Sequence, residues 1–328
     1  MANHRFHWTP ASLVALILTL VPVGLFLAVV VNVAVVSLPA ISQVGLRVLF
    51  STKFSNVFSG TYNPGEYGLV PALWGTLLVA CVALLLAFPM ALAMAVFVSE
   101  FSIGGLGHVI EGLLAVFAGI PPIIYALLSI FVLTVFIRPE FAGDGLSEEF
   151  IKSLPGLPRW SPGMLPNNLS TLLGGIMLSL LIVPFMAPLI LDAIRNVPAG
   201  LKEASLALGA TRWFTLRHVT LPTAGSGIVA ALSLGILKTI GDVVISAWTI
   251  GYVKNGLPVP LWNILEAVAP LTSTGAGILS GLQPGATLSV GLDRAVAYFT
   301  ALLLLVLAFA ILGAANLLQW VIRRRLNS

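Results

Sequence analysis

Long apolar runs separated by short polar connections dominate the pattern of this chain. Charge-free runs of about 18 or more residues are typical of transmembrane helices. Five such runs stand out, at residues 11–36, 69–99, 112–137, 169–191 and 295–322. A sixth run, at about 223–252, is interrupted only by Lys238 and Asp242. The pattern therefore predicts an all-α polytopic membrane protein with six transmembrane helices.

Composition agrees with this prediction. The 328 residues are 58% hydrophobic and 9% charged, whereas roughly 25% of residues are charged in soluble domains. We expect one transmembrane domain over residues 1–328, with its core at about 67–322. Cys81 is the only cysteine, which excludes an internal disulfide and a cysteine metal cluster. Apart from His4 and His7, the histidines lack metal-ligand spacing, so we expect no metal site. The basic net charge reflects membrane topology and gives no argument for nucleic-acid binding.

Positive charges near the ends of the runs favour one orientation. With an even number of spans, Arg5, a polar segment near residue 200 and the arginine cluster 323–325 share one side. Loops rich in lysine and arginine are cytoplasmic, so we expect both termini inside. The first run is too long for a signal peptide and is interpreted as a retained span. A seventh span within 267–292 would move the arginine cluster outside. We instead expect an outside segment with a short interfacial or re-entrant helix around residues 261–268.

A polar segment at residues 195–222, here called the island, separates the fourth and fifth runs. Its charged or titratable residues are Arg195, Lys202, Glu203, Arg212, Arg217 and His218. Residues 201–209 have helix-forming composition, and Gly209 suits a sharp turn after a helix. Leu221 and Pro222 open the next span, where proline is tolerated in the first turn. The sequence predicts two short helices joined by a turn, within a cytoplasmic loop at 193–222. Such a segment either lies on lipid headgroups or docks on a protein.

The residue spacing of the island resembles a family motif. In bacterial binding-protein-dependent ABC importers, a cytoplasmic loop reads EAA, three residues, G, nine residues, I, any residue, LP. The island matches this pattern with Glu203, Ala204, Ser205, Gly209, Val219, Leu221 and Pro222. Two departures are mild, since Ser205 replaces alanine and Val219 replaces isoleucine. The resemblance implies that the island is a coupling helix that docks on a separate ATPase subunit through Glu203, Ala204 and Gly209.

The same resemblance implies a fold and an assembly. We expect a permease subunit with type I ABC importer architecture in the bacterial inner membrane. Two permease subunits, identical or different, would combine with two ATPase subunits and an extracytoplasmic solute-binding protein. The chain contains no G-x-x-x-x-G-K-[ST] phosphate loop. We therefore expect no enzyme activity and no cofactor in this chain, with ATP and Mg²⁺ held by the partner ATPase.

Lys238 and Asp242 are unusual because they lie within an apolar run. At a spacing of i and i+4, the two side chains would meet on one helix face. Charges within the membrane usually face a bundle interior or a watery path. The two residues either neutralise each other as a structural pair or lie at the substrate path or a gate.

Two segments narrow the resemblance to phosphate-type permeases. Residues 235–242, GILKTIGD, look like their G-x-x-R-A-x-G-E segment, and residues 119–126, GIPPIIYA, look like GIPSxxYG. The resemblance implies a path or gate for phosphate or a related oxyanion, made by Pro121, Pro122, Tyr125, Lys238, Gly241 and Asp242. Aspartate here replaces glutamate, and lysine replaces arginine and lacks its planar fork for oxyanions. The alternative is a secondary transporter driven by an ion gradient, in which Lys238 and Asp242 relay protons.

Overall fold

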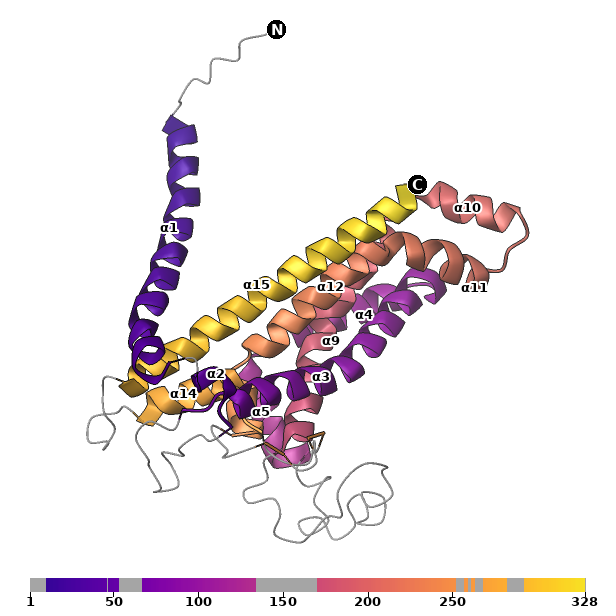
Figure 1. Ribbon diagram of the computed structural model, residues 1–328. Coiled ribbons are helices and arrows are strands. Elements are labelled where there is room, and N and C mark those ends of the chain that lie inside the picture. The colour runs from indigo at the N-terminus through magenta and orange to yellow at the C-terminus, as the bar shows by residue number, and fades with distance from the viewer. Residues whose placement is uncertain are drawn as a thin grey trace, which may run out of the picture.

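The computed structural model describes residues 10–45, 47–52, 67–133, 170–251, 257–258, 261–262, 268–281 and 292–327. Figure 1 shows these segments as a bundle of helices. The long helices are α1 (Pro10–Pro39), α3 (Val70–Val96), α9 (Thr171–Arg195), α12 (Leu221–Gly241) and α15 (Leu292–Asn327). Five of the described helices are long and apolar enough to cross a membrane, and a bent pair raises the number to six. This agrees with the all-helical fold and the span number that the sequence predicts.

Helix α9 forms the centre of the bundle. It packs against α3, α12 and the shorter helix α4 (Leu106–Ala118), and 72% of its most apolar window is buried. Small residues allow these close crossings. A Cβ atom at Gly175 would lie 2.4 Å from Val82, and one at Gly227 would lie 2.5 Å from Ala193. The buried core therefore sits between α3, α9 and α12.

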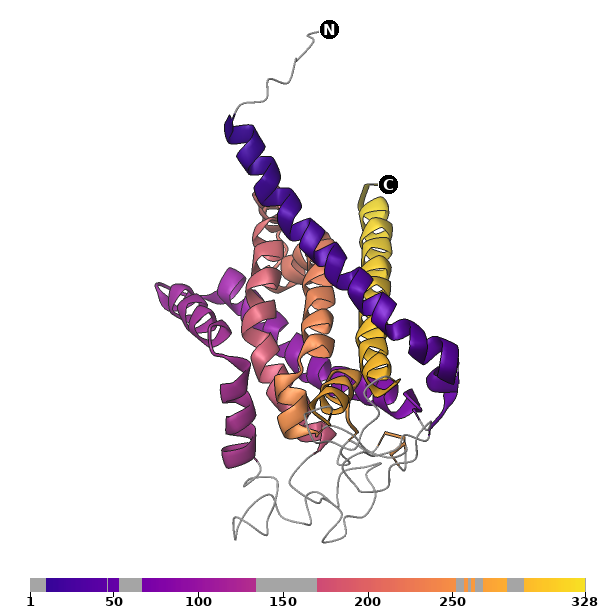
Figure 2. The same cartoon turned by 90° about the vertical axis from the view of Figure 1, so that its left-hand side faces the viewer.

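Helix α1 has the opposite character. None of its most apolar window is buried within the chain, and its first half stands apart from the bundle in Figure 1. It packs against α15 and runs obliquely to that helix (Figure 2). It continues into a π-helical turn (Ala40–Val44). Gly45, with φ +73°, then leads toward the short helix α2 (Arg47–Phe50). An apolar helix whose most hydrophobic part is not covered by the rest of the chain is compatible with a lipid environment, as the first apolar run predicts.

The third apolar run is bent sharply rather than straight. Helix α4 ends at Ala118, and α5 (Pro122–Leu128) starts after a bend of 90°. Pro121 is extended, with ψ 139°, because the proline that follows it disfavours helical backbone at that position. A π-helical turn (Ser129–Leu133) follows α5, and the remainder of the predicted run lies outside the described residues. The sequence indicated the position of the break but not its angle.

The fifth predicted span is not a single helix, which corrects the prediction of one run over 223–252. Helix α12 ends at Gly241, and α13 (Val244–Thr249) begins three residues later. The carboxylate of Asp242 accepts a hydrogen bond from the Ile245 backbone N–H over 2.7 Å. Asp242 thus satisfies a free N–H at the start of α13, as aspartate commonly does. Helix α12 therefore ends just before Asp242, whereas the sequence predicts that Asp242 lies on the face of a continuous helix.

A polar segment at residues 268–281 packs inside the bundle, toward the end where α2 and α5 lie (Figure 1). It contains helix α14 (Leu271–Gly281), whereas the sequence predicts a short helix around 261–268, a stretch that lies mostly outside the described residues. The side chains of Thr272, Ser273 and Thr274 are buried. Each donates a hydrogen bond to a backbone carbonyl, which offsets the cost of burying a hydroxyl group.

The two ends of the bundle are formed by different helices. Helices α10 (Ala199–Ala207) and α11 (Arg212–Thr215) lie at the same end as the start of α1 and the end of α15 (Figure 1). Helices α2, α5 and α14 lie toward the opposite end. The island and the two ends of the described chain therefore share one side, as the predicted orientation requires.

Candidate functional site

The island folds as the two short helices and turn that the sequence predicts. Helix α10 is followed by Gly209, whose φ of +83° is left-handed backbone that favours glycine. The Thr211 hydroxyl accepts a hydrogen bond from the Phe214 N–H over 3.2 Å and so caps α11. A π-helical turn (Leu216–Thr220) then joins α11 to α12 without a break, so that 212–241 form one continuous helix. Movement of α11 must consequently move α12.

Helix α10 presents an open surface. None of its residues is buried within the chain, and both Glu203 and Ala204 are exposed. Two leucines of the island, Leu201 and Leu208, are 46% and 90% exposed, whereas Leu216, in the π-helical turn after α11, is buried. An ordered helix with exposed leucines is typical of a surface that packs against something outside the chain.

Polar contacts hold the island against the bundle. The Lys202 ammonium lies 2.6 Å from the Glu100 carboxylate, and both side chains are about three-quarters buried. Within the island, the hydroxyl oxygens of Ser205 and Thr215 lie 2.9 Å apart and join α10 to α11. Ser205, the departure from the family motif, therefore has a structural role in this chain.

A second ion pair lies at the start of the island. The Arg195 guanidinium donates two hydrogen bonds to Glu111 on α4, over 2.7 and 2.9 Å. This bidentate geometry makes a stronger contact between a guanidinium and a carboxylate than a single hydrogen bond does. Asp192 lies three residues away on the same helix, but the side-chain partner of Arg195 is Glu111. The sequence alone does not indicate this partner, because the two residues are 84 positions apart.

Leu221 and Pro222 connect the island to the membrane. Leu221 packs against the main hydrophobic core, whereas Pro222 is exposed in the first turn of α12. Proline is tolerated there because the first N–H groups of a helix have no partner inside it. The pair thus sets where α12 begins and anchors its first turn.

Lys238 and Asp242 do not form an ion pair, which was one of the two alternatives that the sequence left open. Asp242 lies beyond the end of α12, where its carboxylate binds the Ile245 N–H, and no salt bridge joins the two residues. The Lys238 ammonium lies 5.3 Å from the centre of the Phe185 ring, a cation–π contact. Its side chain is exposed on the surface of the chain. Within the described part of the chain, Lys238 is therefore a positive charge on an apolar helix with no carboxylate bound to it.

The other predicted path residues lie on elements that meet near Asp242. Helix α5, which begins at Pro122 after the extended Pro121, packs against α13. Tyr125 is buried in α5, and its hydroxyl donates a hydrogen bond to the Phe117 carbonyl across the bend over 3.0 Å. The Thr272 hydroxyl of α14 donates to the Asp242 carbonyl over 3.3 Å. The broken spans and α14 thus converge on one region, and Gly241 is exposed there.

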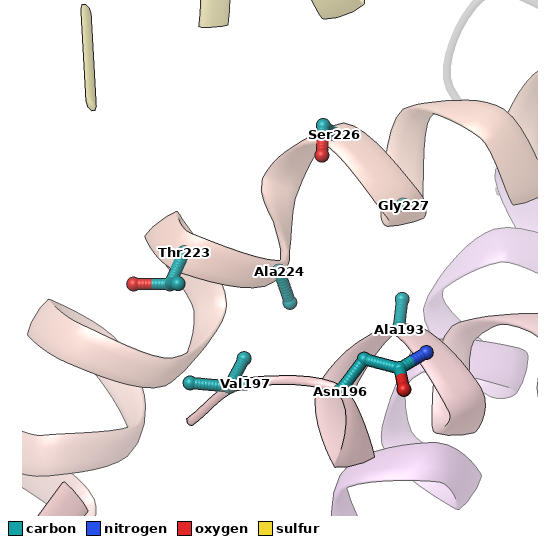
Figure 3. Close-up of a pocket in the computed structure, with 7 residues that line it drawn as sticks. All are labelled: Ala193, Asn196, Val197, Thr223, Ala224, Ser226 and Gly227. Atoms are coloured by element: carbon teal, nitrogen blue, oxygen red, sulfur yellow. The ribbon is translucent and has the colours of Figure 1, made fainter. Parts of the chain in front are cut away.

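A pocket lies next to the island, at the junction of α9 and α12 (Figure 3). Its volume is about 300 Å³, and it is lined by Ala193, Asn196, Val197, Thr223, Ala224, Ser226 and Gly227. The lining carries amide and hydroxyl groups but no charged side chain, and it lies at the start of α12, far along the helix from Lys238. Among the described residues, no group of three or more histidine, cysteine or acidic side chains could hold a metal ion.

Proteins of similar sequence are bacterial permeases. A phosphate transport system permease protein PstC of Haemophilus influenzae is 28% identical over 268 residues, which cover 82% of each chain. PstC 1 of Mycobacterium tuberculosis is 30% identical over 237 residues, covering 70% of this chain and 66% of that protein. The similarity therefore extends over most of the chain and well beyond the island.

Proteins of similar structure are ABC importers. A chain of the bacterial alginate ABC transporter, in complex with an alginate pentasaccharide-bound periplasmic protein, matches with a TM-score of 0.56 and 20% identity over 93% of both chains. A chain of the inward-facing MetNI methionine ABC transporter matches with a TM-score of 0.55 and 21% identity, over 77% of this chain and 95% of that one. At this level of identity, the likeness shows a shared type I importer permease fold.

The model of one protein family matches nearly the whole chain. It spans residues 6–326 and describes the binding-protein-dependent transport system inner membrane component. The chain is thus a multi-pass permease rather than an enzyme, of a kind that typically works with an ATPase, a second permease and a solute-binding protein. This protein belongs to the family of binding-protein-dependent transport system inner membrane components, the permease subunits of ABC importers.

Proposed function

We propose that this permease imports phosphate. The observation that carries the proposal is the extent of similarity to phosphate transport permeases, 28% identity over 82% of the chain in one case. The location of Lys238 supports it, because a cation without a carboxylate partner can attract an oxyanion. Lysine binds phosphate as a point charge rather than through a planar fork, so the replacement of arginine keeps the attraction and loses geometric selectivity.

The path that we propose for phosphate passes the region where α5, α13 and α14 meet. Lys238 would contact the anion, and Asp242 would fix the break between α12 and α13. Pro121, Pro122 and Gly241 would provide breaks that let irregular backbone line a cavity within the membrane. Tyr125 would stabilise the bend, since its hydroxyl already binds the Phe117 carbonyl. Selectivity among oxyanions would come mainly from the solute-binding protein.

The second part of the proposal concerns the island. We propose that α10 docks on the ATPase subunit through Glu203, Ala204 and the turn at Gly209, while Ser205 shapes the island through Thr215. Exposure of most α10 residues, Glu203 and Ala204 among them, supports this role. The continuous helix from α11 into α12 would transmit movement of the docked loop to the region of Lys238. ATP and Mg²⁺ would bind to the ATPase subunits.

The orientation follows from the same docking. An ATPase that uses cytoplasmic ATP requires the island to be cytoplasmic. The start of α1 and the end of α15 lie at the island's end of the bundle (Figure 1), so both termini would be cytoplasmic too. The segment 268–281 at the opposite end would face the solute-binding protein. The second permease subunit, identical or different, would complete the path.

Stimulated ATP hydrolysis tests this proposal. The permease is purified with its ATPase and second permease subunit, reconstituted in nanodiscs, and mixed with the solute-binding protein. We expect the phosphate-loaded binding protein to raise the rate of ATP hydrolysis and the sulfate-exposed protein to leave it unchanged. If only the sulfate-exposed binding protein raised the rate of ATP hydrolysis, the proposal that the substrate is phosphate would be overturned. Absence of any co-purified ATPase would overturn the permease–ATPase coupling itself.

A further inference from the structure

We propose that α3 is a second coupling element, which links the island to the outer segment 268–281 through Lys202 and Thr76. The inference rests on the proposed function, because it needs an ATPase docked on α10. In this account Lys202 and Glu100 form the joint at the island, and Thr76 forms the joint at the other end. A displacement of α10 would then reach the break between α12 and α13 by two routes, one through α12 and one through α3.

The joint at the island is the ion pair between Lys202 and Glu100. Lys202 lies on α10, which otherwise has no buried residue to hold it. Glu100 lies in the π-helical turn (Phe97–Phe101) that extends α3 without a break. The two groups are 2.6 Å apart and largely buried, so the contact is short and shielded from salt. Single π-turns frequently occur at functional sites, and this one places Glu100 beneath α10.

Helix α3 is suited to carry a displacement. From Val70 to Phe101 it is continuous, and at about 1.5 Å per residue the distance from Thr76 to Glu100 is about 36 Å. Four fully buried positions of α3 in the main hydrophobic core are alanines, namely Ala83, Ala87, Ala91 and Ala95. Small side chains at these positions allow small shifts between packed helices, which is the shear motion seen in many switching proteins.

The outer joint is a direct contact between α3 and the segment 268–281. The Thr76 hydroxyl accepts a hydrogen bond from the Leu271 backbone N–H over 3.0 Å. One residue earlier, a Cβ atom at Gly75 would lie 2.5 Å from the Val268 carbonyl oxygen, so the two backbones touch there. Both groups of the hydrogen bond are buried. Movement of α3 therefore requires the segment to move with it or the hydrogen bond to break.

The last step leads to the proposed path. The residue after Leu271 is Thr272, whose hydroxyl binds the Asp242 carbonyl over 3.3 Å. Contacts thus run without a gap from α10 through α3 and α14 to the break between α12 and α13. The Arg195–Glu111 pair is not part of this route, because it connects α9 to α4.

The joint at the island is tested with charge variants in the reconstituted complex. The readouts are the amount of co-purified ATPase and the import ratio, which is the number of phosphate ions imported per ATP hydrolysed. We expect Lys202→Gln and Glu100→Gln to keep the ATPase bound while the import ratio falls by roughly five- to tenfold, within the usual range of coupling effects. The exchanged pair Lys202→Glu with Glu100→Lys should restore the ratio. Asp192→Asn removes an exposed carboxylate at the same end of the bundle and should leave the ratio unchanged.

The route as a whole is tested by a double-mutant cycle. Thr76→Val removes the acceptor for Leu271 and should lower the import ratio, whereas Thr76→Ser keeps the hydroxyl and should not. Because the joints act in series, Lys202→Gln combined with Thr76→Val should be no worse than the more severe single variant, whereas independent effects would multiply. Thermal unfolding of each purified variant identifies any that do not fold.

Two results would overturn the inference. One is a normal import ratio in folded Lys202→Gln and Thr76→Val complexes. The other is multiplication of the two effects, which would mean that the sites act separately. These failures are distinct from failure of the proposed function, in which the unaltered complex itself would show no bound ATPase or no phosphate import.

Discussion

At the scale of single residues, Lys238 is the position where the membrane environment demands an explanation. A cation within an apolar helix is costly and is usually retained where it meets a partner or a substrate. The sequence suggested Asp242 as that partner, but Asp242 instead binds the Ile245 N–H. Among the described residues, the Lys238 ammonium contacts the Phe185 ring and no carboxylate. A transported anion is therefore the simplest complement to its charge.

Replacement of Lys238 tests this interpretation. Lys238→Gln should lower the initial rate of phosphate import by about 10- to 100-fold, since hydrogen bonds to charged groups contribute roughly 1.5–3 kcal/mol. Lys238→Arg keeps the charge and should retain most of the rate. Arg294→Gln removes an exposed cation on α15 as a control and should have little effect. A normal rate for Lys238→Gln would assign Lys238 a purely structural role.

Gly209 provides a second prediction at this scale. Its φ of +83° is strained for any side chain with a Cβ atom, and Gly209→Ala should disfavour the turn by about 1–2 kcal/mol. We expect less ATPase to co-purify, with normal membrane insertion. Gly105 has φ −79° and free space around it, so Gly105→Ala is the matched control. Equal ATPase recovery in both variants would show that the turn does not position α10.

The residue spacing in the island could be interpreted from the sequence, whereas its long-range contacts could not. Glu203 and Gly209 are six positions apart, so both fall within one short sequence motif and can be recognised from it. Lys202 and Glu100 are 102 residues apart, and nothing local in either segment indicates the partner. Ser205 appeared as a neutral departure from the family motif until the structure placed Thr215 next to it.

At the scale of elements, two kinds of helix break behave differently. The break before α5 is evident in the sequence, because Pro121 and Pro122 remove N–H donors and restrict the preceding backbone. The break after α12 has no proline. It arises because the Asp242 side chain competes for a backbone N–H, and aspartate does so only where the tertiary context allows it. The sequence therefore predicted one continuous span there.

Helix α14 escaped prediction for a related reason. Most of its residues are small or carry hydroxyl groups, and they lack the apolar period that identifies a membrane helix. Burial of its hydroxyls is possible only because neighbouring carbonyls accept their hydrogen bonds, which a sequence does not display. The mixed composition of residues 267–292 had instead favoured an outside segment.

The bend between α4 and α5 can be tested through Tyr125. Tyr125→Phe removes the hydrogen bond to the Phe117 carbonyl and should lower stability by about 1 kcal/mol, the usual net contribution of such a bond. The measurement is the thermal unfolding midpoint of the purified complex. Tyr298→Phe is the control, because no hydrogen-bond partner of its hydroxyl is found in the described part of the chain. An equal midpoint for both variants would show that the bend does not depend on this bond.

The contact between α3 and the outer segment can be tested through Gly75. A methyl group there would approach the Val268 carbonyl to 2.5 Å, and backbone cannot move aside as a flexible side chain can. Gly75→Ala should therefore destabilise the protein by about 1–3 kcal/mol, as overpacking commonly does. Gly24 lies on α1 with nothing within 4 Å of its Cβ position. Gly24→Ala should leave the unfolding midpoint unchanged, and the same result for Gly75→Ala would contradict the packing.

At the scale of the whole molecule, the account joins two separated regions. The island lies at one end of the bundle, and the segment that binds the Asp242 carbonyl lies toward the other (Figure 1). Fold class, span number and the place of the island were predictable from hydrophobic runs and motif spacing. The convergence of α5, α13 and α14 was not, because it depends on how the broken spans pack.

The central claim is that ATP hydrolysed by a partner drives phosphate import through this chain. The most direct measurement is uptake of radiolabelled phosphate into proteoliposomes that contain the permease subunits, the ATPase and the external binding protein. We predict uptake that requires ATP inside the vesicles and the binding protein outside, and that persists when ion gradients are collapsed. Uptake that proceeds without ATP and stops when an ionophore collapses the gradient would contradict the account and identify a secondary transporter.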